Sequence, residues 1–373
     1  DKNPLAVDLC KVALWLEGHT GSKPLTFLDH RIRCGDSLVG VFDLSVLKEG
    51  IPDEAFKAVT GDDKAVAREN KKQNKKEREH RQLREFDVAM SVLTGSRQQV
   101  NAIADDKPAD IRRKRDLFSA LQQEGTAWCK DKTACDIWAA AFFVGLTKEH
   151  EQKQMIPTTN TVREYLAGGV SADNPQVKNA RGLANHYRFF HWPLEFPEVF
   201  VKGGFDCVLG NPPWDMIEAN PDEFFYYYIQ NFTKLDSKEK QTQIKTLLKD
   251  QEIAKAWDEF NKKFNSLVKF FHYSKSFNYQ GLGRLNAFKL FTERYHQIAM
   301  KEGYFGILIP SSIYNDKGCT DLRNLLLFEN KIIGLFSFEN REKIFPIHSS
   351  FKFVTLCVKK GERTTLLSAA FML

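Results

Sequence analysis

The chain has 373 residues, of which 42% are hydrophobic and 12% aromatic, so it can bury a substantial core in one large domain or two. No apolar stretch reaches the roughly 18 residues of a membrane span and no charged-then-apolar leader opens the chain, so we expect no membrane segment, no secretion and a cytoplasmic location. The net charge of +6 permits binding to a polyanion without demonstrating it, and seven cysteines without a C-x-x-C pair predict buried free thiols rather than disulfides or a zinc site.

The first predicted element is an amphipathic helix from Pro4 to about Glu17, with Asn3 as a possible N-cap. Residues 31–34 then read as a short strand that leads into the turn Gly35-Asp36-Ser37-Leu38. From the residues alone, Asp36 is either a ligand-binding acid or the first residue of an Asx turn that reverses the chain.

Residues 43–185 are predicted to form a helical insertion between two strands of a sheet. Its most marked segment is a basic stretch with a helical pattern, whose cations are Lys64, Arg68, Lys71, Lys72, Lys75, Lys76, Arg78, Arg81 and Arg84. Because Glu69, Glu77 and Glu79 are interleaved and allow internal ion pairs, a solvated helix face is favoured over a DNA contact. A second, aromatic-rich insertion is predicted over residues 215–278, and its cluster at 224–228 is interpreted as core rather than as a base-stacking surface.

Between and after the insertions, the pattern predicts alternating strands and helices. The apolar run 205–209 predicts a buried strand that ends at Gly210. The remaining predictions are a helix over 286–300, a strand over 304–309, a helix near 321–328, and strands over 332–338 and 351–358. This succession is typical of an α/β fold with a doubly wound sheet.

The motif Asn211-Pro212-Pro213-Trp214 directly follows the strand at 205–209. Neither proline carries an N–H, and each keeps the residue before it extended, so the motif presents acceptors and one flat ring. The Asn211 side-chain oxygen and the Pro212 carbonyl can accept the two N–H groups of an exocyclic amine, while Trp214 stacks on the attached heterocycle. A proline-terminated strand end with a core tryptophan is the alternative, but the position beyond the carboxyl end of a strand favours a ligand site.

Taken in order along the chain, these blocks resemble the S-adenosylmethionine-dependent methyltransferases that act on adenine N6 in DNA. The resemblance is strongest to the methylase domains of type IIG restriction-modification and related phage-defence systems. The blocks that carry it are Asp1-Lys2-Asn3-Pro4, Gly35-Asp36-Ser37-Leu38, Phe190-His191-Trp192, Phe196-Pro197-Glu198-Val199-Phe200, Asn211-Pro212-Pro213-Trp214, Leu285-Asn286-Ala287-Phe288, Ile309-Pro310-Ser311-Ser312 and Ile344-Phe345-Pro346. They span nearly the whole chain.

The resemblance implies an α/β fold with a Rossmann-like S-adenosylmethionine-dependent methyltransferase sheet and large helical insertions. It also implies S-adenosylmethionine as cofactor, double-stranded DNA as partner, flipping of the target base, and no metal. The residues that it implicates are Asn211, Pro212, Pro213 and Trp214 in catalysis, Trp214 and Phe345 on opposite faces of the flipped base, and Asp1, Asp36, Asn286 and Phe288 in cofactor binding. Read without the resemblance, Asp1 is a helix N-terminal acid and Phe345 is equally well a core residue.

The resemblance divides the chain into core segments at 1–42, 186–214 and 279–373, separated by the two insertions. It also implies that the first two strands, the glycine-rich loop that cradles the methionine part of the cofactor, and the target-recognition domain or specificity module lie outside this sequence. We therefore expect a fragment of a longer protein, inactive when isolated. The strand that ends at Asn211 is expected to have an edge that is unpaired or covered by something non-native.

Two alternatives stay open. Asn-Pro-Pro-aromatic also serves protein-glutamine and some RNA N-methyltransferases, which are usually compact, so the two long insertions favour DNA. A non-catalytic DNA-binding subunit with a degenerate pocket is the other alternative.

Overall fold

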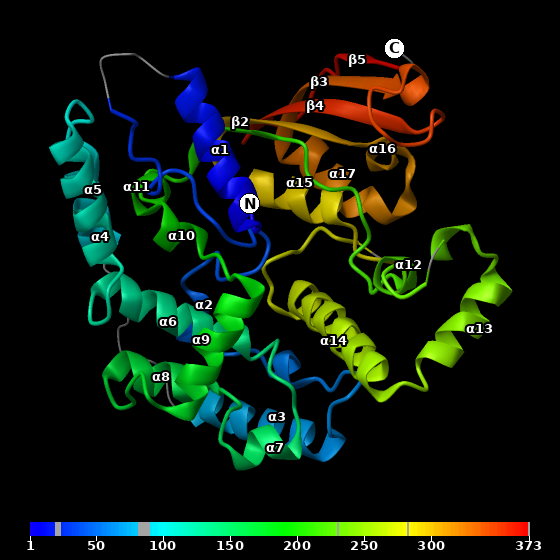
Figure 1. Cartoon of the computed structure of the whole chain (residues 1–373). Coiled ribbons are helices and arrows are strands. Elements are labelled where there is room, and N and C mark those ends of the chain that lie inside the picture. The colour runs from blue at the N-terminus through cyan, green and yellow to red at the C-terminus, as the bar shows by residue number, and fades with distance from the viewer. Residues whose placement is uncertain (19–23, 81–89, 230, 282, 372–373) are drawn as a thin grey trace.

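The computed structural model describes residues 1–18, 24–80, 90–229, 231–281 and 283–371, and it combines a five-stranded mixed sheet with many helices (Figure 1). The predicted α/β fold is confirmed. The strand order is β1 (Phe205–Gly210), β2 (Ala299–Pro310), β4 (Lys352–Lys360), β3 (Asn330–Glu339) and β5 (Ala369–Ala370). Strand β1 is parallel to β2, β4 is antiparallel to both of its neighbours, and β5 is parallel to β3.

The helices α15 (Ala287–Ile298) and α17 (Thr320–Phe328) pack on the same face of the sheet, below it in Figure 1. Both connections, β1 to β2 and β2 to β3, advance across the sheet in one direction, and right-handed crossovers then place both helices on one side. Phe305 and Ile307 are buried on that face, whereas Tyr304 on the other face is 45% exposed. Within the described residues, the sheet is therefore covered on one face and is not doubly wound as predicted.

Strand β1 is an edge strand, and the prediction that it is buried is wrong. None of its residues is buried, and Leu209 is 82% exposed. Among the described residues, β1 pairs only with β2, so its other edge has no partner, as expected from the resemblance. An apolar run shows that a segment can be buried, but burial itself depends on what pairs with it and covers it.

The segment 43–185, which the resemblance assigns to the first insertion, is largely helical. Its helices are α2 (Val46–Glu49), η1 (Asp53–Phe56), α3 (Lys64–His80), α4 (Met90–Ala102), α5 (Pro108–Leu121), α6 (Ala127–Ala140), α7 (Lys148–Gln152), α8 (Thr159–Ala167) and α9 (Pro175–Tyr187). Helix α6 is buried from Thr133 to its end at Ala140, and its Trp138 indole donates to the Gly50 carbonyl at 3.0 Å. Arg81 and Arg84 of the predicted basic stretch lie outside the described residues. The short helices α10 (Trp192–Glu195) and α11 (Pro197–Phe200) lead from this insertion to β1.

The second insertion contains α12 (Pro221–Phe225), η2 (Phe232–Lys234), α13 (Ser237–Leu247) and α14 (Gln251–Tyr273). Its aromatic cluster divides into two parts. Phe224 and Phe225 pack on Trp257, with ring centroids 5.0 and 4.9 Å away, so the predicted core role holds for them. Tyr227, by contrast, is 86% exposed, and the core prediction is wrong there.

The beginning of the chain forms helix α1 (Pro4–Glu17), as predicted, and the Asn3 side chain caps it by accepting from the Leu5 N–H at 3.0 Å. Its apolar side is not buried, since Leu9 is 68% exposed. Residues 31–34 do not form the predicted strand. They make no ladder, and the one strand-like contact nearby is an isolated bridge between Asp36 and Phe189.

Two further predictions need correction. Helix α15 ends at Ile298 rather than at residue 300, because Ala299 already pairs with Phe205 of β1 and begins strand β2. The cysteines were all expected to be buried, but only Cys135 and Cys319 are buried. The others are partly or fully exposed: Cys10, Cys34, Cys129, Cys207 and Cys357.

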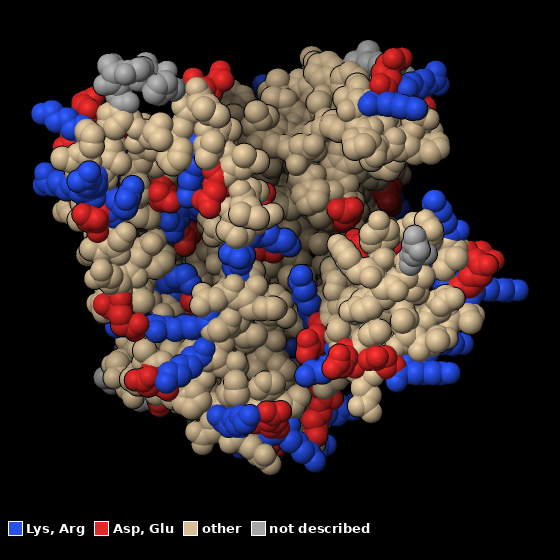
Figure 2. All heavy atoms as spheres, in the orientation of Figure 1, with Lys and Arg blue, Asp and Glu red and all other residues tan. Residues whose placement is uncertain are grey.

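Lys and Arg are intermixed with Asp and Glu on the face seen in Figure 2, and no single charged patch dominates it. Within the described parts of the chain, no helix is long and apolar enough to cross a membrane.

Candidate functional site

The motif Asn211-Pro212-Pro213-Trp214 lies immediately beyond the carboxyl end of β1. The strand closes on a glycine because a Cβ at Gly210 would collide with the hydroxyl of Tyr295 on α15. In the motif, Asn211 and Pro213 are exposed, Pro212 is buried and Trp214 is half-buried. The Asn211 carboxamide is therefore accessible to a ligand at the end of the strand.

Trp214 is fixed in place by one hydrogen bond and several rings. Its indole N–H donates to the Leu308 carbonyl of β2 at 3.2 Å. Phe351 lies parallel to the indole at a centroid distance of 5.6 Å, and Phe345 meets it edge-on at 5.8 Å. Because Trp214 and Phe345 touch directly, the arrangement predicted from the resemblance, with a base held between these two rings, requires Phe345 to move.

The loop that carries Phe345 is organised by Asn340, a residue that the sequence did not single out. Asn340 is fully buried. Its side-chain oxygen accepts from the Phe345 N–H at 3.0 Å, and its amide group donates to the carbonyls of Phe345 and Ile347, each at 3.0 Å. This one carboxamide thus bonds to the backbone of both Phe345 and Ile347, and it holds the loop that positions the Phe345 ring.

Asn286 links the motif to helix α15. Its side-chain oxygen caps the helix by accepting from the Phe288 N–H at 3.1 Å, and its amide group donates to the Trp214 carbonyl at 3.1 Å. Phe288 is 4% exposed and belongs to the core beneath the sheet. Of the four residues predicted to bind the cofactor, Asn286 and Phe288 therefore lie near Trp214, and Asn286 supports the motif directly.

A cavity of about 740 Å³ opens beside Trp214. Ligand sites usually measure about 300–1,000 Å³, so this cavity can admit a nucleotide. Its wall combines an aromatic surface with hydroxyl groups and cations, and the main contributors are Trp214, Asn286, Phe288, Lys289, Ser311, Ser312, Phe351 and Lys352.

Asp1 and Asp36 are brought together at the start of α1. The Gly35 N–H donates to the Asp1 carbonyl at 2.9 Å, and the Lys2 ammonium lies 3.7 Å from the Asp36 carboxylate. Asp36 also accepts from the Leu38 N–H at 3.2 Å, so the Asx turn is present. Burial raises the pKa of Asp36 above its ordinary value, while Lys2 opposes that shift. The pKa of Lys263 on α14 is lowered by burial and by Lys2, with Asp36 acting against the decrease.

Arg294 connects the turn at Asp36 to the helix that begins at Asn286. It lies on α15, and its guanidinium is sandwiched between Phe42 and Phe277, whose ring centroids are 4.8 and 4.7 Å away. It donates to the Leu38 carbonyl at 3.5 Å. Burial lowers its pKa to about 9. A single helix thus carries the support of Trp214 at its start and a contact to the Asp36 turn near its end.

A second support of the same turn is the buried pair His191 and Asp136. The His191 Nδ1 accepts from the Val41 N–H at 2.9 Å, so Nε2 carries the proton and donates to the Asp136 carboxylate at 2.9 Å. Asp136 belongs to α6, and the pair joins the segment after Asp36 to the core of the first insertion. The sequence placed His191 in a family block without indicating this partner.

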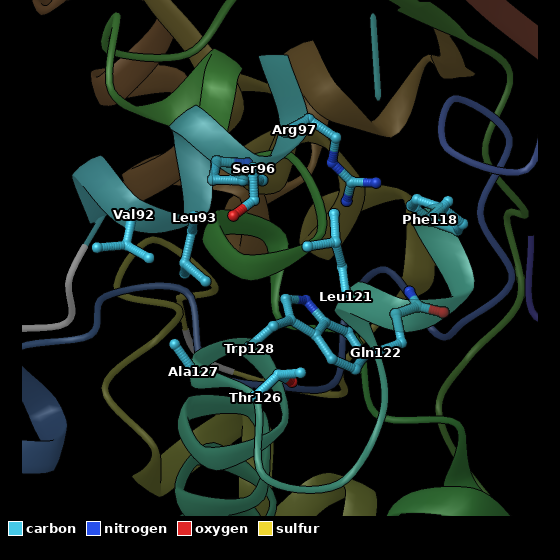
Figure 3. Close-up of a pocket in the computed structure, with 11 residues that line it drawn as sticks. Val92, Leu93, Ser96, Arg97, Phe118, Leu121, Gln122, Thr126, Ala127 and Trp128 are labelled. Carbon is cyan, nitrogen blue, oxygen red and sulfur yellow. The ribbon is translucent and has the colours of Figure 1, made fainter. Parts of the chain in front are cut away.

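A smaller cavity of about 110 Å³ lies in the first insertion, between α4, α5 and the start of α6 (Figure 3). Trp128 and Leu121 form much of its wall, and Arg97 reaches its upper rim in that view. None of the predicted site residues lines it, so it is separate from the candidate site. Among the described residues, no three His, Cys, Asp or Glu side chains are grouped so that they could hold a metal ion.

Comparison with known proteins gives a family match. A family model described as Eco57I restriction-modification methylase matches residues 1–256, more than half of the chain. No curated protein matches.

Two solved structures superpose on the chain, both at 12% sequence identity and a TM-score of 0.27. One, from Listeria monocytogenes, is described as a class I S-adenosylmethionine-dependent methyltransferase, and the match covers 76% of this chain and 85% of that one. The other, from Vibrio vulnificus, is described as a modification subunit of a type I restriction enzyme, with 96% and 73% covered.

Proposed function

Because the chain belongs to the family of Eco57I restriction-modification methylases, we propose that it is an adenine-specific, site-specific DNA methyltransferase. In this proposal a methyl group passes from S-adenosylmethionine to N6 of an adenine flipped out of double-stranded DNA. The reaction would serve a restriction-modification or phage-defence system. We assign the reading of the DNA sequence to a target-recognition domain or specificity module.

The observation that carries this proposal is the exposed Asn211 carboxamide at the end of β1, next to the Pro212 carbonyl and the fixed ring of Trp214. The amino nitrogen of adenine is a poor nucleophile because its lone pair is delocalised into the ring. Two acceptors that draw its protons restore the lone pair, which then points toward the methyl donor. Trp214 would stack on the base and offset part of the stacking lost on flipping.

The residues near the start of α1 fit the adenosine part of S-adenosylmethionine. The Asp1 carboxylate is exposed and can accept from ribose hydroxyls. One Asp36 oxygen accepts from the Leu38 N–H, which leaves the other, facing Lys2, to accept from the adenine amino group of the cofactor. When bound, the cofactor supplies a methyl group that is electrophilic because its sulfur carries a positive charge. Asn286 and Phe288 would act on the site through Trp214 and the helix beneath it.

We assign the flipped nucleotide to the 740 Å³ cavity, whose wall includes Trp214 but not Asn211, Pro212 or Phe345, so the base would extend from this cavity toward the end of β1. Ser311 and Ser312 can donate hydroxyl hydrogen bonds, and Lys352 can meet a phosphate. Phe345 would close over the base after its loop moves from the present contact with Trp214. Site-directed variants of the motif test this proposal.

In the full-length protein, Asn211→Ala is expected to lower methyl transfer to DNA by about 10²–10³-fold, the effect of removing one preorganised polar group from an active site. DNA affinity should change little, because phosphate contacts dominate it. Asn220→Ala is the matched control, since Asn220 lies on the same segment but caps α12 through the Asp222 N–H. Transfer by Asn211→Ala at the rate of the control would refute the proposed role of Asn211.

A further inference from the structure

Helix α3 (Lys64–His80) carries a row of cations on its outer face. Lys64, Arg68, Lys71 and Lys75 follow one another at steps of four, three and four residues, and Lys72 lies beside them, so all five project from one side of the helix. All five side chains are exposed. We call this set the cationic stripe. At the rise of an α-helix it extends over about 16 Å.

Most of the cationic stripe is not neutralised by the protein. Within the described residues, Lys64, Arg68, Lys71 and Lys72 form no ion pair, and Lys75 lies 3.9 Å from Glu79. The interleaved glutamates of the sequence predict several ion pairs within this helix, but among the described residues the cationic stripe has only the pair of Lys75 with Glu79. Glu77, however, is engaged by the Asn160 N–H at 2.9 Å and by the Gln73 amide at 2.9 Å.

The inner face of α3 packs against the rest of the protein, and none of these packing contacts involves the cationic stripe. Val66 and Ala67 are buried there, and Asn74 is fully buried. The Asn74 amide donates to the Ile51 carbonyl at 2.8 Å, and its oxygen accepts from the Thr159 N–H at 3.0 Å.

The cationic stripe itself works against the helix. Lys64 and Arg68 are four residues apart, as are Arg68 and Lys72, and like charges at that spacing destabilise a helix. The fold therefore tolerates an unfavourable charge pattern that a partner of opposite charge would relieve.

We propose that the cationic stripe binds the phosphate backbone of duplex DNA, away from the base that is methylated. A straight row of about 16 Å can reach a few backbone phosphates, because each strand winds around the duplex axis while it carries one phosphate per 3.4 Å of that axis. Lys and Arg on an exposed helix contact phosphates without reading base edges, so this contact is independent of sequence. Figure 1 shows α3 at the lower edge and the sheet at the top, so the proposed contact lies apart from the sheet. The choice of DNA rests on the proposed function.

The test is the salt dependence of DNA binding by the full-length protein. The stripe variant combines Arg68→Gln, Lys71→Gln and Lys72→Gln. When the logarithm of its association constant for DNA is plotted against the logarithm of the salt concentration, the slope should be smaller in magnitude than that of the wild type by about 0.9 for each lost phosphate contact. Its affinity for a 40-base-pair duplex should fall at least tenfold at 0.1 M salt. The control is Lys238→Gln, Lys245→Gln and Lys249→Gln, which removes the same charge from exposed lysines of the second insertion.

A slope equal to that of the wild type would overturn the proposal, and so would an equal decrease in the control, which would indicate a general effect of net charge. If the stripe variant lost more affinity for an RNA duplex than for a DNA duplex, the assignment to DNA would be overturned. Thermal melting should be unchanged or raised in the stripe variant, because like charges are removed. If the wild type failed to methylate DNA, the proposed function would be contradicted. The salt dependence of DNA binding would still test the cationic stripe, because that measurement does not require methylation.

Discussion

The indole of Trp214 lies parallel to the ring of Phe351, with the planes inclined by 9° and the centroids 5.6 Å apart. One face of the indole is therefore already stacked, and a flipped base has to use the other face or displace Phe351. We expect the base to use the other face, with Phe351 holding the indole in position.

Phe351→Ala should then raise the KM for DNA about fivefold with little change in kcat, because roughly 1 kcal/mol of ring stacking behind Trp214 is lost. Phe351→Tyr keeps the stacked ring and should retain the wild-type KM. Steady-state kinetics of methyl transfer measure both values. A KM lower than that of the wild type would show instead that the base displaces Phe351.

Asn286 has two separable roles, and substitutions can distinguish them. Asn286→Ala loses both the helix cap and the hydrogen bond to the Trp214 carbonyl, and it should lower the free energy of unfolding by about 1–2 kcal/mol. Asn286→Ser keeps an acceptor for the Phe288 N–H and should cost less than half as much. Denaturant unfolding measures both. If Asn286→Ser is as unstable as Asn286→Ala, the cap contributes nothing.

Asn340→Ala should be the most disruptive single change near the site. It removes the hydrogen bonds of a fully buried carboxamide to the Phe345 N–H and to the carbonyls of Phe345 and Ile347, at a cost of about 2–4 kcal/mol in the free energy of unfolding. Asn315→Ala is a control at an asparagine that borders the 740 Å³ cavity. Thermal melting of the two variants tests this, and similar melting temperatures would contradict the role given to Asn340.

Asp36 gives a pH-dependent prediction. Burial raises its pKa above the ordinary 3.8, so the folded protein holds this proton at pH values where the unfolded chain has released it. Stability is therefore lost as pH rises from 3.8 through the raised pKa. Asp36→Asn removes that loss, and its gain in melting temperature should be larger at pH 7.5 than at pH 4.5. The same variant should bind S-adenosylmethionine more weakly by calorimetry. An equal gain at both pH values would refute the electrostatic cause.

Local patterns in the sequence predicted the elements that local interactions determine. Helix α1 begins at Pro4 behind its Asn3 cap, and the strand at 205–210 ends directly before Asn211, as expected. Proline and glycine constrain their own backbone and that of their neighbours, so such boundaries are visible without tertiary structure.

Tertiary contacts determine what the sequence missed. Residues 31–34 look like a strand in the sequence, but in the described structure they have no partner strand, and Arg33 instead forms an ion pair with Glu195. Asn340 is an ordinary polar residue in the sequence, and only the folded loop shows that it serves Phe345. Burial of β1 depends on a covering that its own residues do not specify.

Methyl transfer by the full-length protein to duplex DNA, followed by digestion to nucleosides and mass spectrometry, tests the central claim most directly. We predict N6-methyladenine as the product, and about 10²–10³-fold less of it in the same time with Asn211→Ala. Methylated cytosine, or methylation of protein glutamine or of RNA in place of DNA, would contradict it.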